Sequence, residues 1–417
     1  MNNPAASGTL PPRIPRQTRY HYVMNLEHTD ILISGGGVAG LACAAAFGTA
    51  GFRVICVDPT PPDARASGDQ RSTAFWQPSV TVLRAAGLWD RLAPHATPLQ
   101  TMRIIDAGGT EVQPRKIKDF NASDLSDQPF GYNLPNAVLR RELRARLAEL
   151  PSVSFRSGLS TRALLTRDAE ARVTLSDNSR VSSRLLIAAD GRGSAMRAAL
   201  QIPVKTTRYG QMALAFAVTH PLPHQDISTE IHRMGGPFTL VPLPDRDGRP
   251  ASAVVWMTEG PEAQRLQALP EPAFNAAMSE RSCHVLGPLT LASERSLWPI
   301  ISQIADRLSG ERCALIAEAA HVVPPIGAQG LNMSLGDIAA LLTLAQADPA
   351  GLGGTAMLDA YHRQRHPQIR LRVMGIDALN RAAMQGAPVL RDLRGLGLEA
   401  LHGIAPLRKA LMQMGLS

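Results

Sequence analysis

The segment DILISGGGVAGLACAAAFGTAGFRVICVDP, residues 30–59, constrains the fold more than any other part of the chain. It predicts an apolar strand from Asp30 to Ser34, an alanine-rich helix to about Ala50, and a second strand from Arg53 to Val57. A strand, a helix and a parallel second strand form a βαβ unit, whose sheet is covered on both faces. The chain is therefore predicted to have an α/β fold.

Three glycines in the turn of this unit have the G-x-G-x-x-G spacing. Gly35 permits the tight turn, Gly37 lets a pyrophosphate approach the backbone, and Gly40 lets helix and strand pack closely. The free N–H groups of the helix start would face the phosphates. Asp58 ends the second strand, where an acid binds an adenosine ribose and favours an unphosphorylated ribose over NADP. The unit is thus predicted to bind a dinucleotide.

Two later segments repeat the pattern of an apolar strand followed by a glycine-containing element. LLIAADGRGSAMRAAL, residues 185–200, has Asp190 and Gly191 in its turn, and CALIAEAAHVVPPIGAQGLN, residues 313–332, carries Glu318. A dehydrogenase would usually place its chemistry in a following catalytic domain. The two additional glycine-containing elements instead favour FAD over NAD as the bound dinucleotide.

The motifs GGGVAG, ADGRGSAMR and AEAAHVVPP, in this order, resemble those of the FAD-dependent aromatic hydroxylases typified by p-hydroxybenzoate hydroxylase. Within that family the chain looks most like the ubiquinone-biosynthesis hydroxylases. The resemblance runs from about Asp30 over nearly the whole chain, and DQRSTAFWQPSVTVLRAAGLWDRL and LPNAVLRREL are also similar to family segments. It implies a Rossmann-like FAD-binding domain of the p-hydroxybenzoate hydroxylase type, with an inserted β-sheet substrate domain and a helical C-terminal tail.

The expected domains are discontinuous in the sequence. Residues 1–27 are expected to be a disordered extension, and Met24 to be the true start of translation. The FAD-binding domain is expected at 28–95, 130–200 and 295–375, the substrate domain at 96–129 and 201–294, and the tail at 376–417.

The activity that the resemblance implies is hydroxylation of a polyprenylated phenol in ubiquinone biosynthesis. NAD(P)H would reduce FAD, O2 would add to the reduced flavin, and the flavin C4a-hydroperoxide would transfer a hydroxyl group to the ring. The cofactor carries this chemistry, so the protein has to position the substrate and exclude water.

The resemblance also implies which residues hold FAD. Gly35, Gly37 and Gly40 would hold the pyrophosphate and Asp58 the adenosine ribose. The remaining expected contacts are Arg71 at the pyrophosphate or ribityl chain, the Asp190-Gly191 turn at the flavin and the nicotinamide nucleotide, Glu318 at the ribityl hydroxyls, Pro325 in the Pro-Pro pair that redirects the backbone, and the N–H groups of Gly330, Leu331 and Asn332 at the flavin pyrimidine carbonyl.

Direct catalytic residues are less evident. His321 is a candidate acid or base, against the alternative that it is a structural hydrogen-bonding residue. Tyr209 and Gln211 are candidates for the substrate side of the flavin.

Two pairs of residues depart from the family pattern. Its usual Gly-Asp appears as Ala317-Glu318, and its commoner Gly-Gln-Gly as Ala328-Gln329-Gly330. We interpret both as a subfamily variant. The first pair leaves open a flavin-binding scaffold that has lost catalysis, and a monooxygenase for a small aromatic or a secondary metabolite is a further alternative.

Composition excludes several other classes. The net charge is +8, but aromatic residues make up only 4% of the chain and the basic residues are dispersed, which argues against nucleic-acid binding. The four cysteines form no close pair or cluster, so neither disulfides nor a metal site are expected. A cytoplasmic protein is therefore expected. The family resemblance further implies a ubiquinone-biosynthesis complex or a peripheral position on the inner face of the inner membrane, with the basic and apolar tail either on lipid or packed on the domain or a dimer partner.

Overall fold

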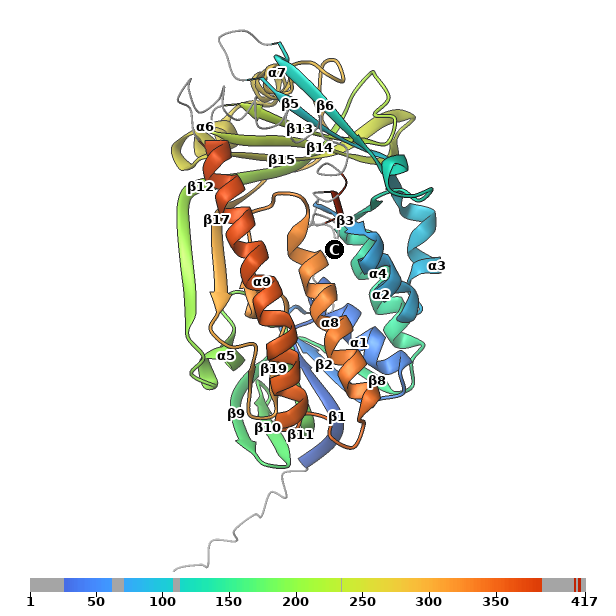
Figure 1. Ribbon diagram of the computed structural model, residues 1–417, viewed down its shortest axis with the longest axis vertical. Coiled ribbons are helices and arrows are strands. Elements are labelled where there is room, and N and C mark those ends of the chain that lie inside the picture. The colour runs from blue at the N-terminus through green and yellow to red at the C-terminus, as the bar shows by residue number, and fades with distance from the viewer. Residues whose placement is uncertain are drawn as a thin grey trace, which may run out of the picture.

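The computed structural model describes residues 26–61, 71–107, 113–233 and 235–384, together with Lys409, Met412 and Gln413. Two large sheets lie at opposite ends of an elongated molecule, and helices cover the space between them (Figure 1). Residues 1–25, most of the expected extension, and nearly all of 385–417 fall outside the described residues.

The first sheet is built around the predicted βαβ unit. Its parallel strands have the order β19 (Cys313–Leu315), β11 (Arg180–Ala188), β1 (Leu26–Ser34), β2 (Val54–Asp58) and β8 (Val153–Ser157), and β18 (Ser309–Gly310), β9 (Thr161–Arg167) and β10 (Glu170–Leu175) add antiparallel edges. Residues 31–33 and all of β2 are buried, as apolar runs covered on both faces must be. The α/β, Rossmann-like fold class is confirmed.

One boundary in this sheet was predicted wrongly. β1 begins at Leu26, four residues before the predicted start, because Leu26–Thr29 pair in parallel with Arg180–Ser183 of β11. Residues 26 and 27 are therefore part of a strand and not of a disordered extension.

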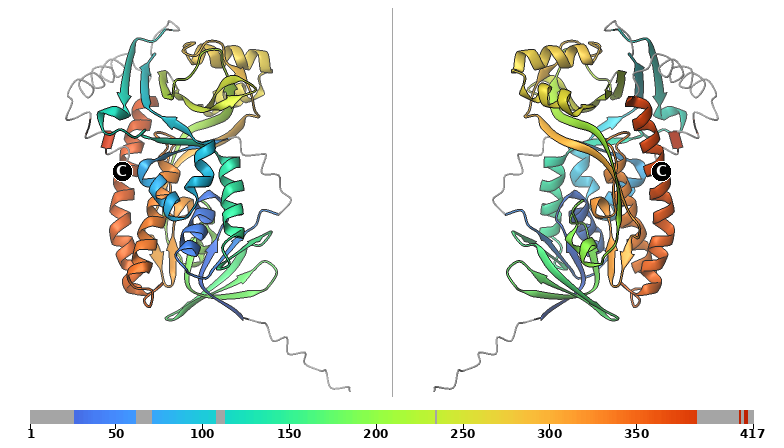
Figure 2. Two further views of the ribbon diagram at one scale, coloured as in Figure 1. Left: turned by 90° about the vertical axis from the view of Figure 1, so that its right-hand side faces the viewer. Right: turned by 90° about the vertical axis from the view of Figure 1, so that its left-hand side faces the viewer.

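Helices pack on this sheet and on one another. They are α1 (Val38–Thr49), α2 (Gln77–Ala85), α3 (Trp89–Leu92), α4 (Asn136–Ala148), α5 (Ala195–Ala199), α8 (Gln329–Ala347) and α9 (Thr355–Met384). α1 is buried along ten of its twelve residues because its small side chains admit close neighbours: a Cβ at Gly48 would lie 2.2 Å from Val153 Cγ2. α9 lies outermost, beside α8 (Figures 1 and 2).

The second sheet forms the other end of the molecule. Its strands have the order β20 (His321–Val322), β17 (Ser296–Ala305), β12 (Val204–Thr219), β15 (Arg249–Glu259), β14 (Gly236–Arg246), β13 (Ile227–Arg233), β5 (Thr101–Asp106) and β6 (Lys116–Asn121), with β16 (Thr290–Leu291) on β12. α6 (Gly260–Ala268) and α7 (Glu271–Arg281) cover one face, where the rings of Phe216, Phe238, Trp256 and Phe274 pack edge to face or tilted. The opposite face looks toward the helices.

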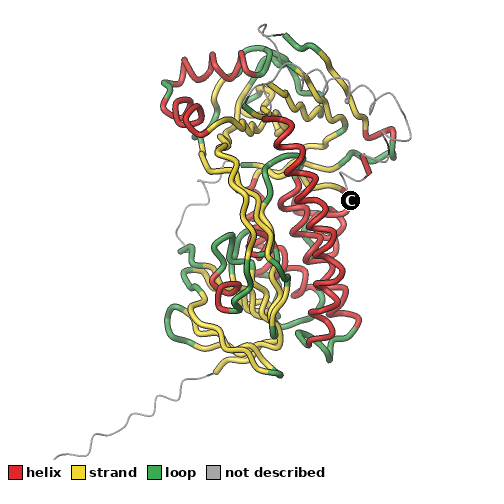
Figure 3. Tube along the Cα trace, turned by 60° about the vertical axis from the view of Figure 1, so that its left-hand side comes forward, coloured by secondary structure: helices red, strands yellow, loops and turns green. Residues whose placement is uncertain are grey.

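The long strands β12 and β17 join the two ends of the molecule (Figure 3). β12 starts directly after α5, and both strands continue into the second sheet. Their pairing shifts between Arg208 and Met212, where Gly210 has φ +73°. The ladder is therefore continuous except at this one bulge.

A small third sheet lies beside the helices. Its strands are β3 (Ser72–Trp76), β7 (Gly131–Pro135) and β4 (Thr97–Leu99), in the order β3-β7-β4. A Cβ at Gly131 would lie 1.9 Å from the Phe75 carbonyl oxygen, so glycine permits the close approach of β7 to β3.

Two of the expected domain boundaries differ from the observed strands and helices. β17 and β20 pair in the second sheet although they lie in 295–375, a segment expected in the FAD-binding domain. α9 also continues without a break through residue 376, the expected start of the tail, to Met384. Within the described part of the chain, no helix combines the length and the apolar character needed to cross a bilayer.

Candidate functional site

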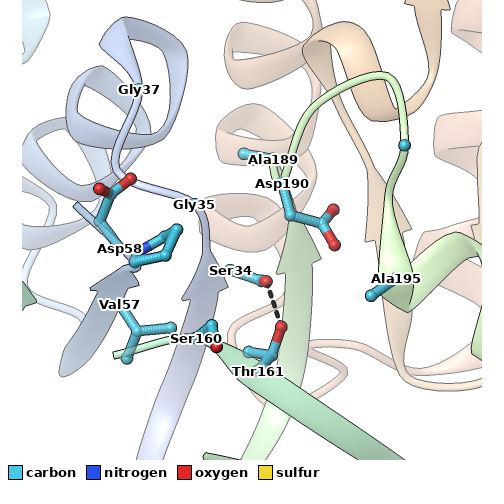
Figure 4. Close-up of a pocket in the computed structure, with 12 residues that line it drawn as sticks. Ser34, Gly35, Gly37, Val57, Asp58, Ser160, Thr161, Ala189, Asp190 and Ala195 are labelled. Carbon is cyan, nitrogen blue, oxygen red and sulfur yellow. Dashed lines mark hydrogen bonds between the residues drawn. The ribbon is translucent and has the colours of Figure 1, made fainter. Parts of the chain in front are cut away.

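A cavity of about 280 Å³ lies where the predicted dinucleotide turn meets the ends of β1, β2 and β11 (Figure 4). Its walls include four residues predicted from the sequence, Gly35, Gly37, Asp58 and Asp190, together with Ser160, Thr161 and Ala195. Asp58 and Asp190 lie on opposite sides of Gly35, and Ser34 Oγ and Thr161 Oγ1, 2.7 Å apart, share a hydrogen bond below the turn (Figure 4). The βα turn and the Asp-Gly turn thus form one site.

The structure explains the presence of glycine differently at each of the three positions of the turn. Gly35 has φ +106°, and a Cβ there would lie 2.3 Å from the Ala189 carbonyl oxygen. A Cβ at Gly40 would lie 1.9 Å from the Gly35 carbonyl oxygen, so α1 could not approach the turn. A Cβ at Gly37 would meet no atom within 4 Å. Protein packing therefore requires glycine at positions 35 and 40. At position 37 the absence of a side chain leaves the backbone open toward the cavity.

The N-terminus of α1 is suited to an anion. Its first intrahelical hydrogen bond runs from Leu41 N–H to the Gly37 carbonyl, which leaves the N–H groups of residues 38–40 available. No side chain caps the helix, and its first turn contains no acidic residue. Free N–H groups and the positive end of a helix dipole bind phosphate.

Asp58 is buried beside this helix start. Its two carboxylate oxygens accept hydrogen bonds from Gly36 N–H at 2.6 Å and Thr60 N–H at 2.8 Å. Each oxygen keeps a second acceptor position, and the residue lines the cavity. The carboxylate can therefore accept ribose hydroxyls while it holds the turn.

Asp190 performs a local task that the sequence analysis did not predict. It accepts Ser194 Oγ–H at 2.6 Å and Met196 N–H at 3.2 Å, and so fixes the start of α5. Gly191, at φ +83°, makes the turn but does not line the cavity. Arg197 donates to the Ala319 carbonyl at 2.8 Å and to the Arg192 carbonyl at 2.8 Å, which joins the Asp-Gly turn to the 317–320 segment.

A second cavity, of about 570 Å³, lies between the start of α8, β3 and the open face of the second sheet. Of the predicted residues it brings together Arg71, Glu318, Pro325, Gly330 and Leu331. The Arg71 guanidinium lies over the Trp298 ring, 5.5 Å from its centroid, and both residues line this cavity. Arg192, next to the Asp-Gly turn, lines it as well, so this turn contributes to both cavities.

Two segments that line this cavity, the one around Glu318 and the one before α8, each contain an alanine with a left-handed backbone conformation. Ala317, with φ +54°, precedes the exposed Glu318, and Ala328, with φ +53°, precedes the first residue of α8. These are the two alanines that depart from the family's glycines. A Cβ at Gly330 would meet no atom within 4 Å, so backbone at the helix start is open to the cavity.

The Asn332 side chain ties α8 to β3. Its Oδ1 accepts Trp76 N–H at 3.0 Å, and its Nδ2 donates to the carbonyls of Ala74 at 2.8 Å and Ala328 at 2.7 Å. Asn332 does not line the second cavity. It therefore contributes through this side-chain link, whereas only its backbone N–H was predicted to contribute.

His321 is buried in a hydrogen-bonded network with Asp337 and does not contribute to the lining of either cavity. Its Nε2 lies 2.7 Å from Asp337 Oδ2, and the Asp337 carboxylate also accepts Ala317 N–H at 3.3 Å and Arg365 Nε–H at 3.0 Å. Asp337 is fully buried, and His321 lines neither cavity. This geometry favours the structural alternative for His321 over the acid or base.

Tyr209 and Gln211 also lie outside the linings of both cavities. Tyr209 donates its hydroxyl to Asp377 Oδ1 at 2.6 Å, and burial together with this hydrogen bond raises the pKa of Tyr209 to about 12. Gln211 donates to the Gly235 carbonyl and accepts from Asn380 Nδ2, both at 3.0 Å. Both residues connect β12 to neighbouring elements and are not placed to touch a substrate.

The hydrogen-bond network around the Asp337 carboxylate was not predicted from the sequence. A charged residue inside the apolar helix sequence NMSLGDIAALLTL was the available signal, because an unpaired carboxylate is not tolerated in such a helix core. Its partner Arg365 lies on α9 and shows no local signal. Among the described residues, no group of three His, Cys, Asp or Glu side chains could hold a metal ion.

Comparison with known proteins agrees with the cofactor type. A family model described as an FAD binding domain matches residues 28–374. Ubiquinone hydroxylase UbiL of Rhodospirillum rubrum is 32% identical over 390 residues, covering 92% of this chain and 88% of that protein. The 3-demethoxyubiquinol 3-hydroxylase of Escherichia coli is 26% identical, covering 94% of this chain and all of that protein.

Solved structures share the fold. A probable FAD-dependent monooxygenase of Pseudomonas aeruginosa, PqsL, superposes with a TM-score of 0.73 at 22% identity, covering 86% of this chain and 98% of that one. The p-nitrophenol 4-monooxygenase PnpA of Pseudomonas putida reaches a TM-score of 0.77 at 18% identity, covering 94% of this chain and 99% of that one.

The residues present fit an FAD molecule. Open backbone occurs at Gly37 and at Gly330, each at a helix start, and the loop around Arg192 and Gly193 borders both cavities. An extended dinucleotide needs such a pair of sites, one for its phosphates and one for its ring. Arg71 and Glu318 supply a cation and an acceptor at the second site.

Asp58 provides a first test. We predict that Asp58→Asn weakens FAD binding about 10- to 100-fold, because hydrogen bonds to a charged acceptor contribute about 1.5–3 kcal/mol. Titration of apoprotein with FAD, followed by flavin fluorescence, measures the dissociation constant. Asp177→Asn, on an exposed turn of the same sheet, is the control and should leave affinity unchanged. Equal affinities for all three proteins would contradict a cofactor role for Asp58.

The left-handed alanines provide a second test. Ala317→Gly and Ala328→Gly should each leave the free energy of unfolding unchanged or raise it by up to about 1 kcal/mol, because relief of left-handed strain exceeds the added entropy of the unfolded chain. The control is Ala320→Gly, at φ −95°, which should be destabilised by about 1 kcal/mol. Urea unfolding separates these outcomes, and a loss of stability in all three variants would refute the argument from strain.

Asp337 provides a third test. Asp337→Asn should lower the free energy of unfolding by about 3 kcal/mol, since it leaves Arg365 without its buried counter-charge. Asp359→Asn breaks the surface pair with Arg307 and should cost less than about 1 kcal/mol. Equal losses in urea unfolding would show that the buried network has no special weight.

Proposed function

The chain belongs to the FAD binding domain family and, within it, to the ubiquinone hydroxylases, and from this membership we propose that it hydroxylates the ring of a polyprenylated phenol in ubiquinone biosynthesis. The proposal makes it an NAD(P)H- and FAD-dependent aromatic-ring monooxygenase with O2 as co-substrate. Bound FAD would supply the redox chemistry, from activation of O2 to transfer of one oxygen atom to the ring.

Besides family membership, the structural observation that supports the proposal most is the second cavity. At about 570 Å³ it has the size of sites for organic ligands, and it reaches from the start of α8 to the open face of the second sheet. Its lining on that sheet includes a group of small and β-branched side chains, Ala215, Thr239, Val241, Ala253 and Val255, beside the charged Arg103 and Glu230 and the ring of Trp298. The small side chains leave room for an apolar ligand of extended shape.

The residues would divide the work as follows. Gly37 and the start of α1 would hold the pyrophosphate, and Asp58 would hold the adenosine ribose. Glu318 would accept ribityl hydroxyls, and the N–H groups at Gly330 and Leu331 would stabilise the negative charge that gathers on the flavin pyrimidine carbonyl upon reduction. We assign no acid or base among the side chains: positioning and exclusion of water are their contribution.

Electrostatics at the second cavity also suits a reduced nucleotide. Arg71 and Arg192 both line it and provide positive charge, and Arg192 directly follows the Asp-Gly pair, where NAD(P)H would approach. We further propose that the substrate reaches the enzyme from a ubiquinone-biosynthesis complex or from the inner face of the inner membrane, where the protein would be peripheral.

Purified protein tests the proposal directly. It should be yellow with bound FAD, and an alkenyl phenol such as 2-allylphenol should accelerate its oxidation of NADPH or NADH. Flavin absorbance and the rate of nicotinamide oxidation are the measurements. FAD binding without turnover would favour the scaffold, and turnover only with simple phenols would favour a small-aromatic monooxygenase.

In a strain that lacks the gene, quinone profiling should show an accumulated intermediate one hydroxylation short of ubiquinone. An unchanged quinone pool, in a strain with no second such hydroxylase, would contradict the proposal. If the protein binds no FAD after incubation with an excess of the cofactor, every flavin-based function is contradicted.

A further inference from the structure

The outer face of α9 exposes a row of apolar side chains. Leu371, Met374 and Leu379 keep 72%, 59% and 60% of their surface exposed. Three of the described residues' six exposed large apolar side chains thus lie within nine residues of one helix. The other three, Ile117, Leu165 and Leu222, lie singly on β6, β9 and a loop.

Further exposed apolar residues at helical spacing extend this row to a stripe along one side of α9. Exposed Pro367, Leu371, Met374, Ala378 and Ala382 follow one another at intervals of three or four residues, which places them on one side of α9. Leu379 borders the stripe, and neither alanine adds bulk. The stripe presents a shallow apolar surface roughly 22 Å long, at 1.5 Å per residue.

Arginines follow one flank of the stripe. Arg363, Arg370 and Arg381 are exposed and recur at near-whole numbers of turns, so they lie along the same edge. Arg381 pairs with Asp377, the one carboxylate between 363 and 384, and Asp377 also accepts the Tyr209 hydroxyl. Within the described part of the chain, Arg363 and Arg370 have no ion-pair partner.

We propose that this face of α9 docks on an anionic lipid bilayer, with its apolar stripe in the headgroup region and its arginines on lipid phosphates. A helix with an apolar stripe and a basic flank lies in a membrane interface and gains from both contacts. A second copy is a poorer occupant, because the face offers arginines and no free carboxylate to pair with them. The docking rests on the proposed function in one respect: a polyprenyl phenol is a lipid-soluble substrate.

The position of α9 relates the stripe to the cavity. Arg372, on the inner side of the helix, donates to Gln329 Oε1 at 2.6 Å, and Gln329 lines the second cavity. Arg365, two turns earlier on the inner side, joins the Asp337 network. A bilayer on the outer face of α9 would therefore lie one helix diameter from the start of α8.

Vesicle flotation of the full-length, FAD-loaded protein tests the docking. Phosphatidylcholine vesicles containing phosphatidylglycerol should bind it, phosphatidylcholine alone should bind it weakly, and added salt should release it. Arg363→Gln/Arg370→Gln should weaken binding roughly 25-fold, at about fivefold per charge. Leu371→Gln/Met374→Gln should weaken it to a similar extent on both kinds of vesicle.

Matched controls are Leu165→Gln and Arg167→Gln, exposed residues of the β9 hairpin at the far end of the molecule, which should bind like the unchanged protein. Flavin absorbance and light scattering of each variant report folding and oligomeric state. Binding that survives the α9 changes, or an oligomer that Leu371→Gln/Met374→Gln dissociates, would overturn the docking. Protein that oxidises NADPH with 2-allylphenol but never floats would overturn it alone, leaving the proposed function intact.

Discussion

The buried carboxylate of Asp337 is the interaction on which the arrangement of the site depends. It lies on α8, and its three hydrogen bonds reach the backbone of the 317–320 segment, the imidazole of His321 and the guanidinium of Arg365 on α9. A charge without exposure to water is stable only where partners surround it, so the positions of three elements are fixed by one group. The orientation of Glu318 and the approach of α8 to the second cavity follow from it.

Local patterns predicted the parts of the site that local physics determines. The glycine spacing, the strand that ends in Asp58 and the Asp-Gly turn could be read because each depends on a few neighbouring residues, and the cavity they form contains Gly35, Gly37, Asp58 and Asp190. The fold class was predictable for the same reason. What could not be read were contacts between distant segments: Asn332 with β3, Arg197 with Ala319, and Asp337 with Arg365.

The errors have a common physical cause. The early start of β1 depends on pairing with β11, some 150 residues later, and the assignment of β17 to the second sheet depends on pairing with β12. His321, Tyr209 and Gln211 were predicted as catalytic candidates from their residue types. Their hydrogen-bond partners, which the sequence does not reveal, determine their roles. The departures at Ala317 and Ala328 were visible in the sequence, but only the backbone shows that both are left-handed residues.

The ladder of β12 and β17 limits how the two ends of the molecule can move relative to each other. Paired strands resist stretching, and here their register is interrupted at one place, beside Gly210. A change in shape would therefore concentrate at that bulge as a bend and leave the length of the ladder unaltered. The second sheet could tilt over the start of α8, but it could not withdraw from it, so the spacing between the two cavities is a fixed dimension of the fold.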